Sequence, residues 1–287
     1  MQEIPHISFH GSDRLEAEGF ELLSLQSLFA RRETSLNHNP HQPHRITFNI
    51  LMVITSGEAR HFVDFTTYKL LPGNCLQLFS HQVHAFDSSP RVKGYLILFT
   101  DAFLYKNLHP DVHTYLMQNV KYRRARVAFH APELQVELLQ RLQQLSTKGI
   151  FRKSEIGAIL TSFYARLFSD EPAHVQVNNQ KYQAHFLRFN RLIEDYYRES
   201  RSANFFAEKM GITYKHLNEI CQKCTSLPAK RYIDEWVVLE AKRMLVSTSL
   251  SIKEIAYELG FDEPTNFQKY LKRHLTCTAR EFRDQYA

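Results

Sequence analysis

One pattern that occurs twice limits the possible folds of this chain more than any other feature. Residues 202–224 and residues 251–275 each have the spacing of a helix, a glycine and a second helix. The two glycines, Gly211 and Gly260, lie 49 residues apart, which indicates an internal duplication. Glycine readily adopts the left-handed conformation that ends one helix and turns the chain into the next. The last hundred or so residues are therefore predicted to contain two helix-turn-helix units.

The first unit divides into a buried face and an outward face. Ser202 and Thr213 are predicted to cap its two helices, because their hydroxyls can accept hydrogen bonds from the free N–H groups of a first turn. The predicted buried face is apolar and consists of Phe205, Phe206, Met210, Leu217, Ile220, Cys221 and Cys224. The outward face of the second helix is left with Tyr214, Lys215, Asn218, Glu219 and Gln222.

The second unit repeats this arrangement. Ser251 is predicted to cap its first helix, and Pro264 to begin its second helix, where a missing N–H costs nothing. The residues with inward spacing are Ile252, Ile255, Ala256, Leu259, Phe267, Tyr270 and Leu271. The residues left on the outer side are Thr265, Asn266, Gln268, Lys269, Lys272 and Arg273.

A long helix is predicted between the two units, over residues 228–248. About 18 helical residues span ~27 Å. Such a helix can hold two recognition helices about 34 Å apart, the separation of successive major-groove turns on one face of DNA. Exposed lysine and asparagine suit guanine and adenine edges in that groove. One copy of the pattern is equally compatible with an ordinary helical hairpin, whereas two copies on a shared helix favour DNA binding.

The last hundred residues resemble the DNA-binding domain of the AraC/XylS family of bacterial transcription regulators. Residues 251–261, SIKEIAYELGF, are similar to the best-known signature of that family. The residues that extend this match are Phe267, Lys272, Arg273, Phe282 and Arg283, with Ala207, Gly211, Leu217 and residues 240–245 in and after the first unit. The match is specific and covers a long span.

The chain departs from the family pattern at four positions. Ser226 and Thr276 stand where the family usually has glycine after each recognition helix, and Ala279 stands where it usually has proline. A non-glycine residue in a left-handed cap costs on the order of 1 kcal/mol, so these helices are expected to end differently. Pro264 replaces a residue that is often polar in the family and offers no side-chain hydrogen bond to a base.

The resemblance implies a set of DNA-reading residues. Bases are expected to be contacted by Lys215, Asn218 and Glu219 in the first unit and by Thr265, Gln268 and Lys269 in the second. Tyr214, Gln222, Asn266 and Arg273 complete the predicted DNA-binding face. For each of these residues the alternative is a solvated helix face or a phosphate contact.

The first part of the chain is rich in predicted strands. From about Arg45 to Phe103, short apolar runs alternate with turns, which predicts a small antiparallel barrel or sandwich, and leucine-rich helical spacing follows over residues 132–145 and 155–168. Residues 71–74 and 81–84 resemble the cupin-like effector domain that many family members carry.

The predicted fold class is therefore α+β, with an N-terminal cupin-like antiparallel β-barrel and accessory helices, followed by an all-α domain with two helix-turn-helix units. The predicted regions are an effector domain over residues 1–170, a linker over 171–181 and a DNA-binding domain over 182–287.

Histidines and cysteines raise the question of a metal site. A catalytic cupin needs four ligands around its Pro-Gly turn, and only His84 occupies an expected place, because Arg60, Phe62 and Thr66 stand at the other three. A non-standard site that uses His61 and His81 stays open. Prolines interrupt the cluster of His38, His41 and His44, which predicts an extended arm that leads into the first strand.

Cys221 and Cys224 form a C-x-x-C pair, which raises a redox or a zinc interpretation. The second ligand pair that a zinc site needs could come only from His274 and Cys277. Helical spacing favours instead two cysteines that pack into a core.

Charge and hydropathy narrow the class of partner. The net charge of +6 divides into a surplus of +2 in residues 1–180 and +4 in residues 181–287, which favours a polyanion as the partner of the second part. Apolar runs fall short of the ~18 residues that span a bilayer, and the polar start does not resemble a signal peptide. We expect a soluble cytoplasmic protein without a membrane partner.

The function predicted from these patterns is sequence-specific control of transcription. Double-stranded DNA is the expected partner, with a small-molecule effector in the barrel, a second copy of the chain in a homodimer, and RNA polymerase if the protein is an activator. No cofactor and no catalytic residue is expected, and no effector-binding residue is indicated. Two alternatives stay open: a metal-dependent cupin enzyme fused to a DNA-binding domain, and an effector-independent DNA-bending protein.

Overall fold

The computed structural model describes residues 6–7, 19–32, 39–86, 92–117, 128–145, 149–169 and 180–286. The chain divides into two compact units, one of Ile4–Glu171 and one of Pro172–Ala287. Most of the predicted linker, up to residue 179, lies outside the described residues, and its last two residues begin a helix.

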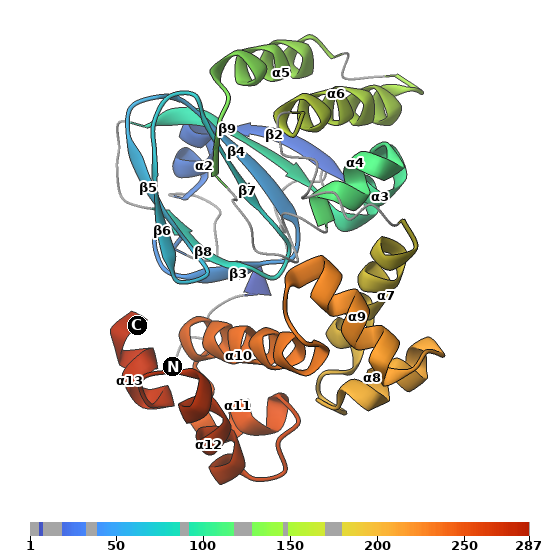
Figure 1. The fold of residues 1–287 in the computed structure, drawn as a ribbon. Coiled ribbons are helices and arrows are strands. Elements are labelled where there is room, and N and C mark those ends of the chain that lie inside the picture. Colours follow the sequence, from blue (N-terminus) through green and yellow to red (C-terminus); the bar gives the residue numbers. More distant parts are fainter. Residues whose placement is uncertain are drawn as a thin grey trace. The chain divides into compact units, whose positions relative to one another are not determined.

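The N-terminal unit contains two five-stranded sheets (Figure 1). Apart from the parallel pair β1 and β3, all neighbouring strands are antiparallel. One sheet has the order β1 (His6–Ile7), β3 (His44–Ile46), β8 (Val83–Phe86), β5 (Ala59–Val63) and β6 (Thr66–Leu70). The other has the order β10 (Ala128–His130), β7 (Asn74–Leu78), β4 (Asn49–Ser56), β9 (Lys93–Phe99) and β2 (Phe20–Ser24).

Helices cover one face of the second sheet, as Figure 1 shows for α5 and α6. The contact is polar as well as apolar, because the Tyr164 hydroxyl on α6 donates to Oε1 of Gln77 on β7 over 2.5 Å, and Gln135 on α5 donates to the carbonyl of Ile54 over 2.8 Å. All three side chains involved are fully or almost fully buried. The helices of this unit are α2 (Leu25–Arg32), α3 (Asp101–Asn107), α4 (Pro110–Tyr115), α5 (Pro132–Gln144) and α6 (Arg152–Leu167).

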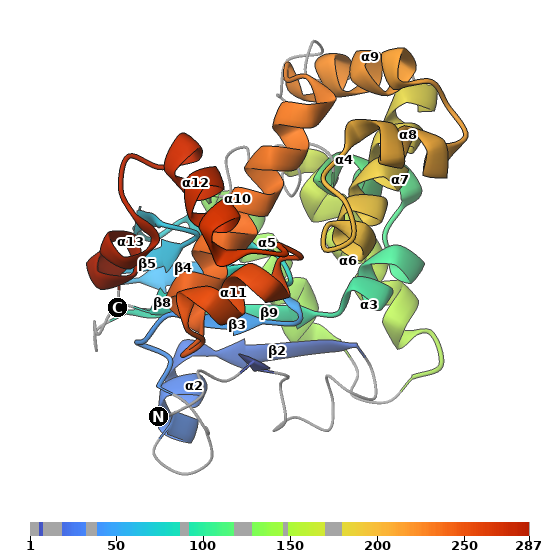
Figure 2. The ribbon, with the colours of Figure 1, turned by 90° about the horizontal axis from the view of Figure 1, so that it is seen from below.

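The C-terminal unit is helical throughout its described length. Figure 2 shows α10 running from α8 and α9 at one end to α11, α12 and α13 at the other. Its helices are α7 (Gln180–Tyr196), α8 (Ala203–Met210), α9 (Tyr214–Thr225), α10 (Ala229–Ser247), α11 (Ile252–Glu258), α12 (Pro264–His274) and α13 (Ala279–Tyr286). The predicted fold class, a strand-rich unit followed by an all-α unit with two helix-turn-helix pairs, is confirmed.

An aromatic core joins α7 to α8 and α10. Phe186 and Phe189 on α7 are fully buried, and their rings lie 5.4 Å and 6.0 Å from the ring of Tyr232 on α10. The Tyr232 hydroxyl donates to Oδ1 of the buried Asn190 over 2.5 Å. Because the tyrosine hydroxyl has this partner, a large polar side chain fits the core without a desolvation penalty. The ring of Phe206 on α8 lies 5.8 Å from that of Phe189, so α8 packs on the same core as the long helix.

Candidate DNA-binding surface

The first helix-turn-helix pair is α8 and α9. Gly211 between them has a φ of 69° and is left-handed, and the Thr213 hydroxyl accepts from the His216 N–H over 3.2 Å, as predicted. The prediction for Ser202 was wrong in part. Ser202 stands at the N-cap position of α8, but its hydroxyl makes no capping hydrogen bond, and its own N–H donates instead to the Ser200 hydroxyl over 3.1 Å.

The cysteine pair of α9 belongs to the core. Cys221 and Cys224 are buried beside Leu217 and Ile220, and neither forms a disulfide bond. Burial, followed by the nearby Cys224, raises the pKa of the Cys221 thiol. A thiol held in its protonated form is a poor metal ligand and a poor nucleophile. The packing interpretation of the C-x-x-C pair is therefore confirmed.

The outward face of α9 contains residues of two kinds. Tyr214, Lys215 and Gln222 are exposed. Asn218 is half-buried, and its side-chain oxygen accepts from the Ala229 N–H at the start of α10 over 3.0 Å. Pro228, the N-cap residue of α10, has no capping side-chain hydrogen bond, so Asn218 supplies one from a different helix.

Glu219 also has a partner inside the protein. Its carboxylate accepts from the Tyr182 hydroxyl on α7 over 2.6 Å and lies 3.6 Å from Nδ1 of His216. The hydrogen bond from Tyr182 holds the pKa of the Glu219 carboxyl below its usual value. Tyr182 was not among the sequence-predicted residues, because it lies 37 positions before its partner and no local pattern connects the two. Asn218 and Glu219 therefore have structural roles in addition to any contact with DNA.

The second helix-turn-helix pair is α11 and α12. Ser251 and Glu254 form a capping box, with the Glu254 N–H on the serine hydroxyl over 3.2 Å and the Ser251 N–H on the glutamate over 2.7 Å. Gly260 has a φ of 72° and Pro264 is the first residue of α12, as predicted. The exposed residues of α12 include Thr265, Asn266, Gln268, Lys269 and Arg273, so every sequence-predicted residue of this helix lies at the surface.

Two side chains of α12 form hydrogen bonds within the protein. The Thr265 hydroxyl donates to the carboxylate of Glu263 over 3.2 Å. Tyr270, predicted to face inward, is half-buried, and its hydroxyl donates to the carboxylate of Asp234 on α10 over 2.9 Å. This hydrogen bond attaches the second recognition helix to the long helix.

The helix ends differ in backbone conformation at the positions where the chain departs from the family pattern. Ser226 keeps the left-handed conformation after α9, with a φ of 61°. After α12, which ends at His274, the C-cap residue Leu275 is extended with a φ of −112°, and Thr276 is not among the described residues with a positive φ. At the start of α13, the Thr278 hydroxyl accepts from the Glu281 N–H over 3.2 Å, which replaces the usual proline start beside Ala279. The expectation of altered helix ends is confirmed for α12, whereas α9 keeps the family geometry with a serine.

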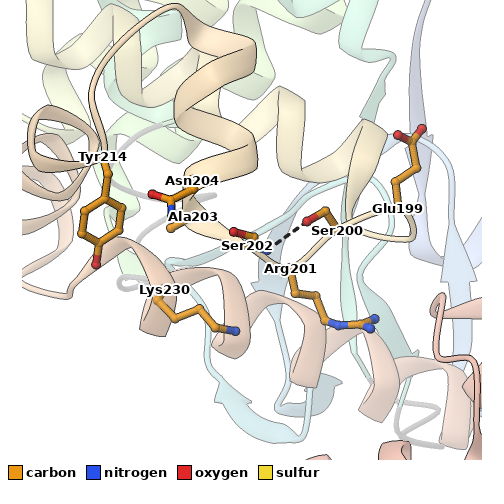
Figure 3. Close-up of a pocket in the computed structure, with 8 residues that line it drawn as sticks. All are labelled: Glu199, Ser200, Arg201, Ser202, Ala203, Asn204, Tyr214 and Lys230. Atoms are coloured by element: carbon orange, nitrogen blue, oxygen red, sulfur yellow. Dashed lines mark hydrogen bonds between the residues drawn. The ribbon is translucent and has the colours of Figure 1, made fainter.

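A groove opens beside the first recognition helix (Figure 3). It has a volume of about 640 Å³ and lies between the loop after α7, the first turn of α8, the start of α9 and the start of α10. The lining residues are Glu199, Ser200, Arg201, Ser202, Ala203, Asn204, Tyr214 and Lys230. Hydroxyls, an amide, two cations and the N–H groups of a helix start are the donors that proteins use for phosphates.

A second hollow lies beside the second recognition helix. It has a volume of about 280 Å³ and is lined by Arg201, Phe261, Asp262, Asn266, Lys269, Tyr270 and Arg273. Arg201 therefore lines both hollows, although it precedes the first helix-turn-helix pair in the chain. Helical spacing predicts the recognition helices but not the loop residues Ser200 and Arg201, because residues in a loop carry no periodicity.

Comparison with known proteins agrees with this geometry. Residues 206–285 match a family described as a helix-turn-helix domain. The transcriptional activator RhaR of Mannheimia succiniciproducens is 21% identical over 277 residues, which cover 92% of this chain and 97% of that protein. The C-terminal unit thus matches a helix-turn-helix family, and the similarity to RhaR extends over nearly the whole chain.

Two further similarities are shorter. The Msm operon regulatory protein of Streptococcus mutans is 27% identical over 127 residues, which cover 44% of this chain and 46% of that protein, less than half of its length. A solved transcriptional regulator with an AraC-type DNA-binding domain from Chromobacterium violaceum is 26% identical over 38% of this chain and 97% of that one, with a TM-score of 0.34.

The strand-rich unit contains a buried histidine cluster. The register of β3, β8 and β5 places His44, His61 and His84 on one face, and each is at most 4% exposed. Nε2 of His61 lies 3.1 Å from Nδ1 of His84, and the rings of His44 and His84 are 4.2 Å apart. Burial, followed by the charge of His44, lowers the pKa of His61 to about 3. The His61 imidazole is thus arranged to stay neutral.

The histidines considered for alternative metal sites lie in different surroundings. His81 is exposed on a turn, whereas His61 is buried against His84, so the two members of the non-standard site have different surroundings. His41 in the predicted arm stacks on Phe29, and His38 lies outside the described residues. Across the described parts of the chain, no group of three or more histidine, cysteine or acidic side chains is arranged to hold a metal ion. None of the described helices is long and apolar enough to cross a membrane.

Proposed function

We propose that this chain regulates transcription by binding a two-part site on double-stranded DNA, with α9 and α12 in successive major grooves. The observation that carries the proposal is the presence of two helix-turn-helix pairs on one helix, α10, which has 19 residues. A helix of that length spans about 28 Å, close to the ~34 Å between major-groove turns on one face of DNA.

The exposed side chains of the two recognition helices are the proposed base contacts. On α9 these are Lys215 and Gln222, and on α12 they are Asn266, Gln268 and Lys269. Lysine suits the acceptor edge of guanine, and asparagine or glutamine suits adenine. Thr265 and Arg273, with Tyr214 and Lys230 at the groove, are assigned to phosphates or bases at the rim. Asn218 and Glu219 are assigned first to holding α9 in place, because their oxygens accept hydrogen bonds from α10 and α7.

The strand-rich unit is proposed to receive the signal. An effector or a second copy of the chain that binds this unit would shift the population of DNA-binding arrangements, which requires different affinity for the two states. Activation with RNA polymerase as a partner, in the cytoplasm, is the proposed mode. It is supported by the similarity to RhaR, which is named a transcriptional activator.

Selection from genomic fragments tests this function. The full chain is incubated with a fragment pool at about 50, 100 and 200 mM salt, a range over which phosphate contacts weaken strongly. Enrichment of a two-part site about one helical turn apart, with affinity that falls steeply in salt, supports the proposal. Salt-sensitive binding without sequence preference would indicate a DNA-bending protein. Stoichiometric bound metal together with no DNA binding would favour the cupin enzyme.

A further inference from the structure

We infer that Arg201 is a positioning residue that joins the two helix-turn-helix pairs directly and sets the spacing between DNA half-sites that the chain accepts. The inference rests on the proposed DNA binding and adds what determines the spacing between the two half-sites. Arg201 lies in the loop between α7 and α8, immediately before the first pair. Its guanidinium, however, is bound to the second pair.

The contact uses both terminal nitrogens and one face of the guanidinium. Nη1 donates to the Leu259 carbonyl over 3.0 Å, Nη2 donates to the Gly260 carbonyl over 3.1 Å, and Cζ lies 3.8 Å from the centre of the Phe261 ring. A planar fork that donates to two carbonyls while it stacks on a ring has one orientation only. Lysine, with one flexible ammonium, does not reproduce this geometry.

The carbonyls that Arg201 binds lie at the end of α11, where a helix leaves its last C=O groups without partners. A cation near a helix C-terminus is also favoured by the helix dipole. The first pair has a comparable contact, because Arg188 donates to the carbonyls of Lys209 and Met210 at the end of α8 over 3.2 and 3.3 Å. Arg188 comes from the adjacent α7 and closes its own pair, whereas Arg201 closes the other pair.

The backbone confirms that the loop and the turn are in close contact. A Cβ added to Gly260 would lie 1.8 Å from the carbonyl oxygen of Arg198. The Arg198 guanidinium also lies 3.5 Å from the carboxylate of Glu258, on α11. Only a glycine permits this approach, and so the turn of the second pair is seated on the loop that begins the first pair.

The Arg201 contact adds a second connection between the two helix-turn-helix pairs, besides α10. The two pairs are joined covalently through α10, and the hydrogen bonds of Asn218 and Tyr270 hold each pair to that helix but do not join one pair to the other. The loop contact joins them at a second place, and two attachments fix an orientation. Because Arg201 lines the hollows beside both recognition helices, it is placed where a change of orientation would alter the distance between them. Figure 3 shows its side chain leaving the groove of the first pair.

The experiment compares Arg201→Lys with Arg188→Lys, which makes the same chemical change at a contact within one pair. Binding is measured to the selected two-part site, to versions with one base pair inserted or removed, and to single half-sites. For Arg201→Lys we expect about tenfold weaker binding to the native spacing, a smaller penalty for altered spacing than in the wild type, and unchanged half-site affinity. Arg188→Lys is expected to keep the wild-type preference for spacing.

Two results would overturn the inference. One is a wild-type spacing preference in Arg201→Lys. The other is an equal loss on half-sites and full site with a salt dependence reduced by about one ion, which would assign Arg201 to a phosphate. A second variant, Phe261→Leu, removes the stacked ring but keeps an apolar side chain, and is expected to change spacing preference in the same direction.

A distance measurement without DNA separates this inference from the proposed function. Spin labels on cysteines introduced at Gln222 and Gln268, with Cys277→Ser in the background, report the separation of the two recognition helices. We expect a broader distance distribution in Arg201→Lys than in the wild type or in Arg188→Lys. An unchanged distribution would show that Arg201 does not position the pairs, whatever the chain binds.

Discussion

At the residue scale, the two duplicated glycines share a backbone conformation but not their surroundings. A Cβ added to Gly211 would meet open space, whereas one added to Gly260 would collide with the Arg198 carbonyl. Gly211→Ala is expected to lower the free energy of unfolding by about 1 kcal/mol, the cost of the left-handed backbone alone. Gly260→Ala is expected to cost clearly more, since the loop must also move. Urea unfolding followed by Trp236 fluorescence measures both, and equal losses would contradict the close contact.

Asn218 and Gln222 separate a structural role from DNA contact on the same helix. Asn218→Ala removes the acceptor of the Ala229 N–H and is expected to lower the free energy of unfolding by about 1 kcal/mol, as for a lost N-cap. Gln222→Ala should stay within about 0.5 kcal/mol of the wild type, as for other surface changes, yet weaken DNA binding. Thermal unfolding and DNA titration of both variants provide the test. A stable Asn218→Ala that loses base preference would instead support the base contact implied by the family resemblance.

At the element scale, the strands β3, β5 and β8 surround a buried His61 that stays neutral in the folded protein. The pKa of His61 is lowered to about 3 in the folded protein, against 6.5 for the ordinary side chain. Below pH 6.5 the unfolded chain therefore takes up a proton that the folded chain refuses. Stability should fall as the pH falls through this window, at up to about 1.4 kcal/mol per pH unit for one such histidine.

Hydrogen exchange measured by mass spectrometry on β5 and β8 peptides reports this loss after correction for intrinsic rates. Measurements at about pH 8, 6.5 and 5 compare the protein above the window, at its upper edge and inside it. His61→Gln is expected to flatten the dependence, while His109→Gln, at an exposed position, should leave it unchanged. A pH-independent wild type would show that the buried cluster is hydrated or charged in solution.

Elements were predictable where the sequence repeats at short range, and not where partners lie far apart. The turn at Gly211, the capping box at Ser251 and the start of α12 at Pro264 follow from neighbouring residues. Other contacts join residues that lie 11 to about 40 positions apart: the pairing of β3 with β8, the Asn218 cap on α10, and the hydrogen bond between Tyr182 and Glu219. Partners this far apart are brought together by closing a long loop, and this produces no periodic pattern in the sequence. Ser202 stands at the predicted N-cap position, but its hydroxyl makes no capping hydrogen bond, because its own N–H is bound to the Ser200 hydroxyl in a loop geometry that helical spacing does not predict.

At the scale of the whole molecule, the duplication predicts that the DNA site is read in two independent parts. Lys215 and Lys269 are exposed on different recognition helices and are the proposed guanine contacts. Lys215→Ala is expected to cost about 1–3 kcal/mol of binding and to relax base preference in one half-site only. Lys269→Ala should do the same in the other half-site, and the double variant should show additive losses, because the two sites are far apart.

Selection of randomised sites with each variant measures base preference position by position, with Lys106→Ala on α3 as the control for lost charge. A loss spread evenly over all sequences, with a reduced salt dependence, would reassign the lysine to a phosphate. Relaxed preference in both half-sites from one substitution would contradict independent reading. It would mean instead that base reading by one pair depends on the other pair, beyond the spacing that the Arg201 contact sets.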